Sequence, residues 1–197
     1  AIKRSMTQHS KYQNKNPIHQ FFLQRFLSRI QSAVEATGAK TILDAASAQG
    51  YVINYLRTRL PGLAFTGIDI DDEALAEARA TLPGISFMHG DITSYVHPEP
   101  VDLVLALEVF EHVSNPERAF KNLAQVKSKF FLFSVPHEPL FRTMNFLRGR
   151  HWERLGNHPE HVNLWSKHTF TRDLEPYFEV IEDYSSFPWI IYLVRSK

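Results

Sequence analysis

The sequence contains no cysteine among its 197 residues. Disulfides, thiolate zinc sites and a cysteine nucleophile are therefore excluded. Long apolar runs are also missing, because stretches such as Phe130–Phe133 are far shorter than the ~20 residues that a membrane span requires. The first residues carry no signal-peptide pattern. These absences predict a cytoplasmic protein with no membrane span.

The sequence also has no excess of one charge. Lys and Arg number 22 against 21 for Asp and Glu, so the chain as a whole offers no general attraction for nucleic acid or an anionic membrane. Any contact with nucleic acid would have to be local. With 44% hydrophobic residues and no break in composition, the chain is expected to form one domain around one core.

Helical and β-branched segments alternate along most of the chain. A first helix is predicted after Asn16, with Pro17 at its first position and its end near Gly38. Its apolar face is predicted from helical spacing to comprise Ile18, Phe21, Phe22, Phe26, Ile30 and Val34. Alternating short apolar runs and helical stretches then predict a mostly parallel sheet with helices on both faces.

The predicted fold is α/β and Rossmann-like, a seven-stranded, mostly parallel sheet. Its strands are expected at 41–45, 64–69, 85–88, 102–107, 130–135, 178–183 and 189–195. The last two are separated by only residues 184–188, which forces them to pair antiparallel. We assign residues 17–197 to a single domain and residues 1–16 to a flexible N-terminal segment. Residues 136–165 are expected to be an insert over the active site.

Small and acidic residues lie at the carboxyl ends of the first strands. The strand Thr41–Ala45 contains Asp44 and runs into Ala46–Gly50, where small side chains let a ligand approach the backbone. The second strand ends at Asp69, whose carboxylate could accept hydrogen bonds from two ribose hydroxyls. The third strand is followed by Gly90–Ile92.

These segments, with the strand Asp102–Leu107, resemble in order and spacing the four cofactor motifs of class I S-adenosylmethionine-dependent methyltransferases. The resemblance covers roughly residues 40–195 and implies S-adenosylmethionine as the cofactor. It implies that Asp44 faces the methionine ammonium, Asp69 holds the ribose and Asp91 holds the adenine amino group. The implied cofactor-binding set is Asp44, Ala46, Gly50, Asp69, Ile70, Asp91, Ile92 and Leu107, with the adenine ring between the two isoleucines.

Two positions depart from the family pattern. Alanines stand at 46 and 48, where the family usually has glycine, and only Gly50 is kept. An alanine in a left-handed conformation costs roughly 1–2 kcal/mol, and its methyl group can crowd the cofactor carboxylate. Weakened or rearranged cofactor contact is therefore one open alternative, and a non-catalytic member of the fold is another.

A dinucleotide-dependent oxidoreductase is the rival interpretation of a small-residue turn followed by an acid. It fits less well, because the G-x-G-x-x-G spacing is absent and Asp44 would repel a pyrophosphate.

Two histidine-bearing segments are expected to meet at the methyl-donor end. One follows the fourth strand and contains Glu108, Glu111 and His112, and a much later one contains His161. Both leave carboxyl ends of strands, so they should converge over the sulfonium. A histidine near neutral pKa suits removal of a proton from a hydroxyl acceptor. His161 and His112 are therefore the candidate catalytic residues.

The set Glu108, Glu111, His112 and His161 also resembles the divalent-metal site of small-RNA 3′-terminal 2′-O-methyltransferases, and a comparable arrangement occurs in ubiquinone-pathway O-methyltransferases. The resemblance implies a Mg or Zn ion that lowers the pKa of the attacked hydroxyl. The alternative is that these side chains only hydrogen-bond loop backbone. Two further expectations are an amphipathic helix in 140–156 over the site and a lid that uses Tyr12 and Asn14.

The sequence thus predicts S-adenosylmethionine-dependent methyl transfer to an oxygen of a small-molecule acceptor, with proximity as the main catalytic term. Methyl transfer to an RNA terminus is the alternative, favoured if a metal is bound and the arginines of the insert form a local phosphate groove.

Overall fold

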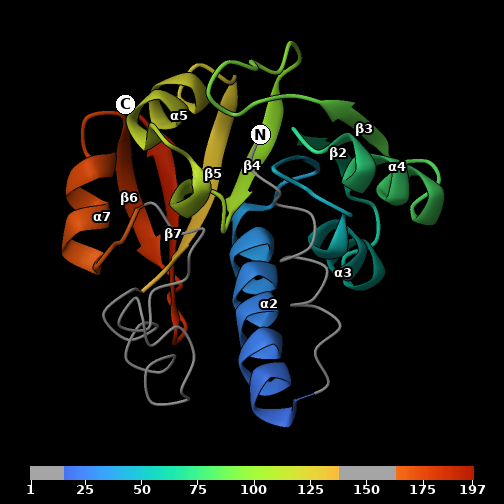
Figure 1. Cartoon of the computed structure of the whole chain (residues 1–197), viewed down its shortest axis with the longest axis horizontal. Coiled ribbons are helices and arrows are strands. Elements are labelled where there is room, and N and C mark those ends of the chain that lie inside the picture. Colours follow the sequence, from blue (N-terminus) through green and yellow to red (C-terminus); the bar gives the residue numbers. More distant parts are fainter. Residues whose placement is uncertain (1–15, 138–162) are drawn as a thin grey trace.

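The computed structural model describes residues 16–137 and 163–197 (Figure 1). Its strands form one seven-stranded sheet in the order β3-β2-β1-β4-β5-β7-β6. Every strand runs in the same direction except β7, which is antiparallel to both of its neighbours. The predicted α/β fold with a reversed last strand is confirmed.

The elements follow the predicted ranges to within a few residues. The strands are β1 Thr41–Ala45, β2 Ala64–Asp69, β3 Ser86–His89, β4 Val101–Leu107, β5 Ser128–Pro136, β6 Phe178–Asp183 and β7 Trp189–Ser196. The helices are α2 Pro17–Thr37, α3 Tyr51–Arg59, α4 Asp72–Thr81, the short 3-10 helix η1 Phe110–His112, α5 Pro116–Leu123 and α7 Lys167–Leu174.

Capping residues explain where the helices begin. The Asn16 side chain accepts hydrogen bonds from the backbone N–H groups of Ile18 and His19 at 3.0 and 3.3 Å. Asp71, Asn115 and Ser166 cap α4, α5 and α7 in the same way. Each cap pairs N–H groups that a helix start leaves without an intrahelical partner.

The core has two layers, one on each face of the sheet. Successive side chains of a strand point to opposite faces of the sheet, so Ile42 packs into one layer and Leu43 into the other. Helices α2, α3 and α4 supply the first layer, and α5 and α7 supply the second (Figure 1).

The predicted apolar face of α2 needs a correction. Phe26, Ile30 and Val34 are buried as expected, but Ile18 and Phe21 are exposed. Phe22 is half-buried against the core, and the fully buried positions begin only at Leu23, because the exposed face of the first turns of α2 lies outside the core.

The order of strands locates the ligand-binding edge. β1 pairs with β2 on one side and with β4 on the other, so the chain reverses its direction of travel across the sheet between β1 and β4. Open α/β sheets bind ligands outside the carboxyl ends of their strands at such a reversal. The segments after β1, β2, β3 and β4 therefore surround one crevice.

Candidate active site

The turn after β1 is held against the end of β2. The backbone N–H groups of Ala46 and Ser47 both donate to the Ile68 carbonyl, at 2.8 and 2.9 Å. Ala46 has φ 99°, Ala48 has φ 45° and Gly50 has φ 76°. The left-handed backbone that would favour glycine is therefore present at both alanines, and the departure from the family pattern carries real conformational strain.

Glycine at position 50 is required by space as well as by conformation. A Cβ atom added to Gly50 would lie 2.5 Å from Cδ1 of Leu82 and 3.2 Å from Cζ of Phe87. The turn carries alanine at 46 and 48, whereas alanine at 50 would require the Leu82 side chain to shift.

Restoring glycine at position 46 should stabilise the protein. We expect Ala46→Gly to raise the free energy of unfolding by about 1 kcal/mol, seen as a melting temperature roughly 2–4 °C higher, because the strain at φ 99° is relieved. Ala48→Gly should gain less, because φ 45° lies nearer the allowed left-handed region.

Ala45→Gly is the matched control for both changes. Ala45 is buried in β1 and is not one of the residues with positive φ, so glycine should destabilise the protein there. A lower melting temperature for Ala46→Gly would show that the turn has adapted to alanine. Calorimetry with S-adenosylhomocysteine on the same variants shows whether the methyl groups also crowd the ligand.

Asp69 is a buried carboxylate at the end of β2, with only 3% of its surface exposed. Its Oδ2 accepts the N–H of Ala48 at 2.9 Å, and its Oδ1 accepts the N–H of Asp71 at 3.0 Å. These two bonds fix the orientation of the carboxylate. Each oxygen has two lone pairs, so the side chain can accept one further hydrogen bond at each oxygen.

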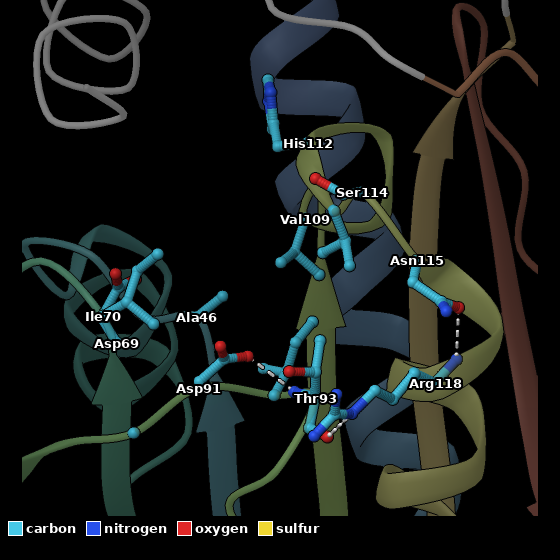
Figure 2. A pocket seen from close by; sticks show the side chains of 13 residues that line it. Ala46, Asp69, Ile70, Asp91, Thr93, Val109, His112, Ser114, Asn115 and Arg118 are labelled. Atoms are coloured by element: carbon cyan, nitrogen blue, oxygen red, sulfur yellow. Dashed lines mark hydrogen bonds between the residues drawn. The ribbon is translucent and has the colours of Figure 1, made fainter. Parts of the chain in front are cut away.

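A cleft of about 280 Å³ opens at this edge of the sheet (Figure 2). Among the predicted site residues, those that line it are Ala46, Asp69, Ile70, Asp91, Ile92 and His112. The remaining wall consists of Gly90, Thr93, Val109, Val113, Ser114, Asn115 and Arg118. Segments that follow β1, β2, β3 and β4 thus meet around one hollow, as the crevice geometry requires.

The other predicted residues lie outside the lining of this cleft. Asp44 is buried in β1, in register with Gly67 of β2 and Leu105 of β4. The lining also leaves out Gly50 and Leu107, and the acids Glu108 and Glu111.

The side of the cleft formed by the loop after β3 is fixed by polar contacts. Asp91 Oδ1 accepts the N–H of Thr93 at 2.7 Å, and Arg118 Nε donates to the Thr93 carbonyl at 3.2 Å (Figure 2). The buried Asn122 amide donates to the carbonyls of Ile92 and Tyr95 at 3.0 and 2.7 Å. The loop after β3 is therefore tied to α5. Sequence reasoning missed Arg118 and Asn122, because the sequence shows only that Asn115 begins the helix on which they lie.

Glu108 has an unusual backbone conformation at the end of β4. Its φ is 51°, and its N–H lies 3.0 Å from the carbonyl and 3.1 Å from the Oγ of the fully buried Ser134. A glutamate in the left-handed region is held there by its surroundings, and such residues concentrate at functional sites. The neighbouring strand β5 thus supports the turn that carries the predicted acids.

The predicted residues Glu111 and His112 lie side by side in η1. The Glu111 side chain is buried, with Oε1 3.9 Å from Nε2 of His112, and His112 lines the cleft. His161 lies outside the described residues. So do the proposed helix in 140–156 and the proposed lid residues Tyr12 and Asn14.

Asn163 ties a distant segment to η1. Its amide nitrogen Nδ2 donates to the carbonyls of Phe110 and Val113 at 3.0 and 2.6 Å. Its backbone N–H donates to the Glu111 carbonyl at 3.4 Å. Asn163, two residues after His161 in the sequence, is therefore hydrogen-bonded to the short segment that carries His112. Nothing in the sequence marked Asn163 for this position.

The described residues alone do not make a metal centre. Within residues 16–137 and 163–197, no three His, Asp or Glu side chains are grouped as metal ligands would be. Glu108, Glu111 and His112 are thus not brought together as a set of three ligands. No helix in the same ranges is both long enough and apolar enough to cross a membrane.

Comparisons with known proteins find methyltransferases. Residues 42–129 match the family described as "Methyltransferase domain", a stretch that begins in β1 and ends in β5. Trans-aconitate 2-methyltransferase from Rhizobium meliloti (strain 1021) is 36% identical over 85 residues, 41% of this chain and 33% of the relative. The enzyme of that name from Escherichia coli O45:K1 is 28% identical over 121 residues, 60% of this chain and 47% of the relative. The chain thus spans between a third and a half of the length of these curated relatives.

Solved structures show the same fold. Magnesium protoporphyrin IX methyltransferase from Synechocystis PCC 6803, with bound S-adenosylhomocysteine, aligns with a TM-score of 0.72 at 16% identity over 98% of this chain and 96% of that one. The methyltransferase domain of bacterial CtHen1 aligns with a TM-score of 0.69 at 20% identity over 88% and 99%.

The fold and the domain match agree with each other. The chain shares its fold with solved methyltransferases, and its residues 42–129 match the model of a methyltransferase domain. The ligand bound in the solved neighbour from Synechocystis is S-adenosylhomocysteine, the product form of the cofactor predicted from the sequence.

Proposed function

We propose that this protein transfers a methyl group from S-adenosylmethionine to an oxygen atom of a small-molecule acceptor. The observation that carries the proposal is the buried, oriented carboxylate of Asp69 in a cleft that also contains Ala46, Ile70, Asp91 and Ile92. A carboxylate with a free accepting position on each oxygen suits the two hydroxyls of a ribose.

The proposed cofactor pose follows from the order of residues around the cleft. The ribose would hydrogen-bond to Asp69, and the adenine ring would lie between Ile70 and Ile92 with its amino group toward Asp91. The methionine part would follow the turn Ala46–Gly50 after β1. This pose directs the sulfonium toward the end of β4 and η1, where His112 lies.

The small-molecule acceptor is supported by the curated relatives, whose name specifies trans-aconitate. The chemistry proposed is in-line displacement, in which the acceptor oxygen attacks the methyl carbon and S-adenosylhomocysteine leaves. A hydroxyl acceptor must lose a proton, and His161 or His112 would receive it. Two residues of chain span at most about 7 Å, so the anchoring of Asn163 to η1 supports His161 as a neighbour of His112.

The test is in two parts. Calorimetric titration with S-adenosylhomocysteine measures cofactor binding directly. Incubation with S-adenosylmethionine and a metabolite mixture, followed by mass spectrometry, identifies the acceptor by the mass of one added methylene. Absence of binding would exclude methyl transfer and favour a non-catalytic member of the fold.

Metal-assisted methylation of an RNA 2′-oxygen is the second candidate. The observation that favours it is that Glu111, which lies beside His112, accepts the backbone N–H of Asn163 at its carbonyl, since His161, two residues earlier in the sequence, would complete the predicted set of ligands. If this set bound an ion, Glu108, Glu111, His112 and His161 would hold it, and the ion would lower the pKa of a hydroxyl.

Chelation separates the two candidates. Under the proposed small-molecule function, EDTA should leave turnover unchanged and Glu111→Gln should keep most of the activity, because the base acts without an ion. Glu117→Gln is the matched control, since Glu117 is an exposed carboxylate of α5 that hydrogen-bonds Tyr177 at 2.9 Å. Activity that falls with EDTA, returns with Mg²⁺ and is severely impaired by Glu111→Gln would establish the metal-dependent candidate instead.

A further inference from the structure

The outer face of α2 carries large apolar side chains that nothing in the core covers. Ile18 is 56% exposed and Phe21 is 57% exposed, and their spacing of three residues puts them on one face of the helix. The ring of Phe22 lies 5.5 Å from that of Phe21 and 5.4 Å from that of Phe187 in the β6–β7 loop. Phe187 is itself 41% exposed. Two elements distant in sequence thus form one continuous apolar patch, the kind of surface that marks an interaction site.

Two arginines continue the same stripe of the helix. Arg25 and Arg29 follow Phe21 by four and eight residues, and the Arg25 guanidinium lies 5.7 Å from the Phe21 ring centroid. Both arginines are exposed, and within the described ranges neither guanidinium forms an ion pair. With Phe21, Gln24 and Ser28 they line a shallow hollow of about 400 Å³. The apolar patch therefore has cationic groups along its border.

The near-zero net charge conceals a strong asymmetry along the chain. Residues 1–34 contain six Lys and Arg and no Asp or Glu, so residues 35–197 carry 16 basic residues against all 21 acids. Positive charge is thus concentrated on the stretch that includes the exposed face of α2. Such asymmetry suggests binding to a polyanionic surface.

We propose that this face, defined by Ile18, Phe21, Phe22, Arg25, Arg29 and Phe187 and here called the α2 face, docks on a bilayer that contains anionic phospholipid. The apolar side chains would enter the boundary between head groups and acyl chains, and the arginines would pair with lipid phosphates. A bilayer fits better than RNA, because the exposed aliphatic Ile18 gains nothing from a phosphate backbone. The attachment would be peripheral, and it does not depend on the proposed methyl transfer.

The position of the α2 face adds a geometric consequence. Helix α2 ends at Thr37, shortly before β1 begins, and therefore starts near the carboxyl edge of the sheet (Figure 1). The β6–β7 loop lies at the same edge, because β6 runs parallel to β1. Docking of the protein through the α2 face would therefore bring the carboxyl edge of the sheet toward the bilayer.

The test is flotation of the full chain with vesicles of phosphatidylcholine alone or of equal parts phosphatidylcholine and phosphatidylglycerol. We expect binding only to the mixed vesicles and weaker binding at high salt. Arg25→Gln should weaken it about five-fold, and the double variant with Arg29→Gln should weaken it about 25-fold. Phe21→Ser should reduce binding strongly in the same assay.

Matched controls change the same kinds of side chain elsewhere. Ile181→Ser alters a 44% exposed isoleucine on β6, and Arg57→Gln alters an arginine in the last turn of α3. Both should bind the mixed vesicles as the unmodified protein does. Melting temperatures of all variants report whether they are folded.

Several results would overturn the proposal. These are no binding to the mixed vesicles, or binding that Phe21→Ser leaves unchanged. Binding of an RNA oligonucleotide through Arg25 and Arg29 in the absence of vesicle binding would assign the face to nucleic acid. Sedimentation showing a dimer that Phe21→Ser dissociates would assign it to a second copy of the chain. Methyltransferase activity is measured separately, so its failure would leave the vesicle result standing.

Discussion

Replacing His161 by alanine should lower kcat by roughly 10²–10⁴-fold while the affinity for S-adenosylhomocysteine stays nearly unchanged. The reason is that a hydroxyl acceptor must lose its proton as the methyl group is transferred, whereas the cofactor pose uses other residues. The observation behind this prediction is that Asn163, two residues after His161 in the sequence, donates three hydrogen bonds to carbonyls of residues 110–113. Initial rates with the acceptor found by mass spectrometry, and calorimetry on the same variant, measure the two quantities.

Other histidines provide the comparison. His89→Ala is the matched control, because His89 is exposed and pairs with Asp72 on the surface, so its loss should not change kcat. His137 follows the carboxyl end of β5, and burial, with a smaller contribution from the charge of Lys167, lowers its pKa. It is thus neutral at pH 7 and able to accept a proton. If His161→Ala keeps full activity and His137→Ala loses activity, His137 would be the base in place of His161.

The effect of His161→Ala also distinguishes acceptor classes. A carboxylate is already deprotonated at neutral pH and needs no base. Trans-aconitate, the acceptor named for the curated relatives, is an acid of this kind. If the acceptor proves to be a carboxylate, His161→Ala should have little effect on kcat, and proximity alone would carry the reaction.

The fold could be predicted from sequence because each local signal agreed with the next. Asn16, Asp71 and Asn115 have side chains that satisfy helix-start N–H groups, and their roles needed no tertiary contact. The reversed β7 followed from a connection too short for a crossover helix. Such features are encoded within a few residues of each other.

The hydrogen bonds that hold the candidate site in place could not be predicted, because they join segments that are distant in the sequence. Glu108 is held in its left-handed conformation by Ser134, 26 residues away, and Asn163 reaches Phe110 across 53 residues. Ile18 and Phe21 fit the helical spacing of a buried face, yet the core does not extend to the first turns of α2. Periodicity identifies an apolar face, but only tertiary structure decides how much of it is covered.

Replacing Asp69 by alanine should weaken the binding of S-adenosylhomocysteine by about 1.5–3 kcal/mol, roughly 10–150-fold in Kd, the scale of hydrogen bonds to a charged group. Because the carboxylate also accepts the N–H groups of Ala48 and Asp71, the alanine variant loses two bonds within the turn. Asp69→Asn, which keeps one accepting oxygen, should therefore show a smaller loss, and melting temperatures separate lost binding from lost folding. Asp72→Ala is the control, since Asp72 is an exposed carboxylate that pairs with His89 outside the lining of the cleft. Unchanged affinity in a folded Asp69→Ala protein would contradict the cofactor pose and, with it, the observation on which the proposed function rests.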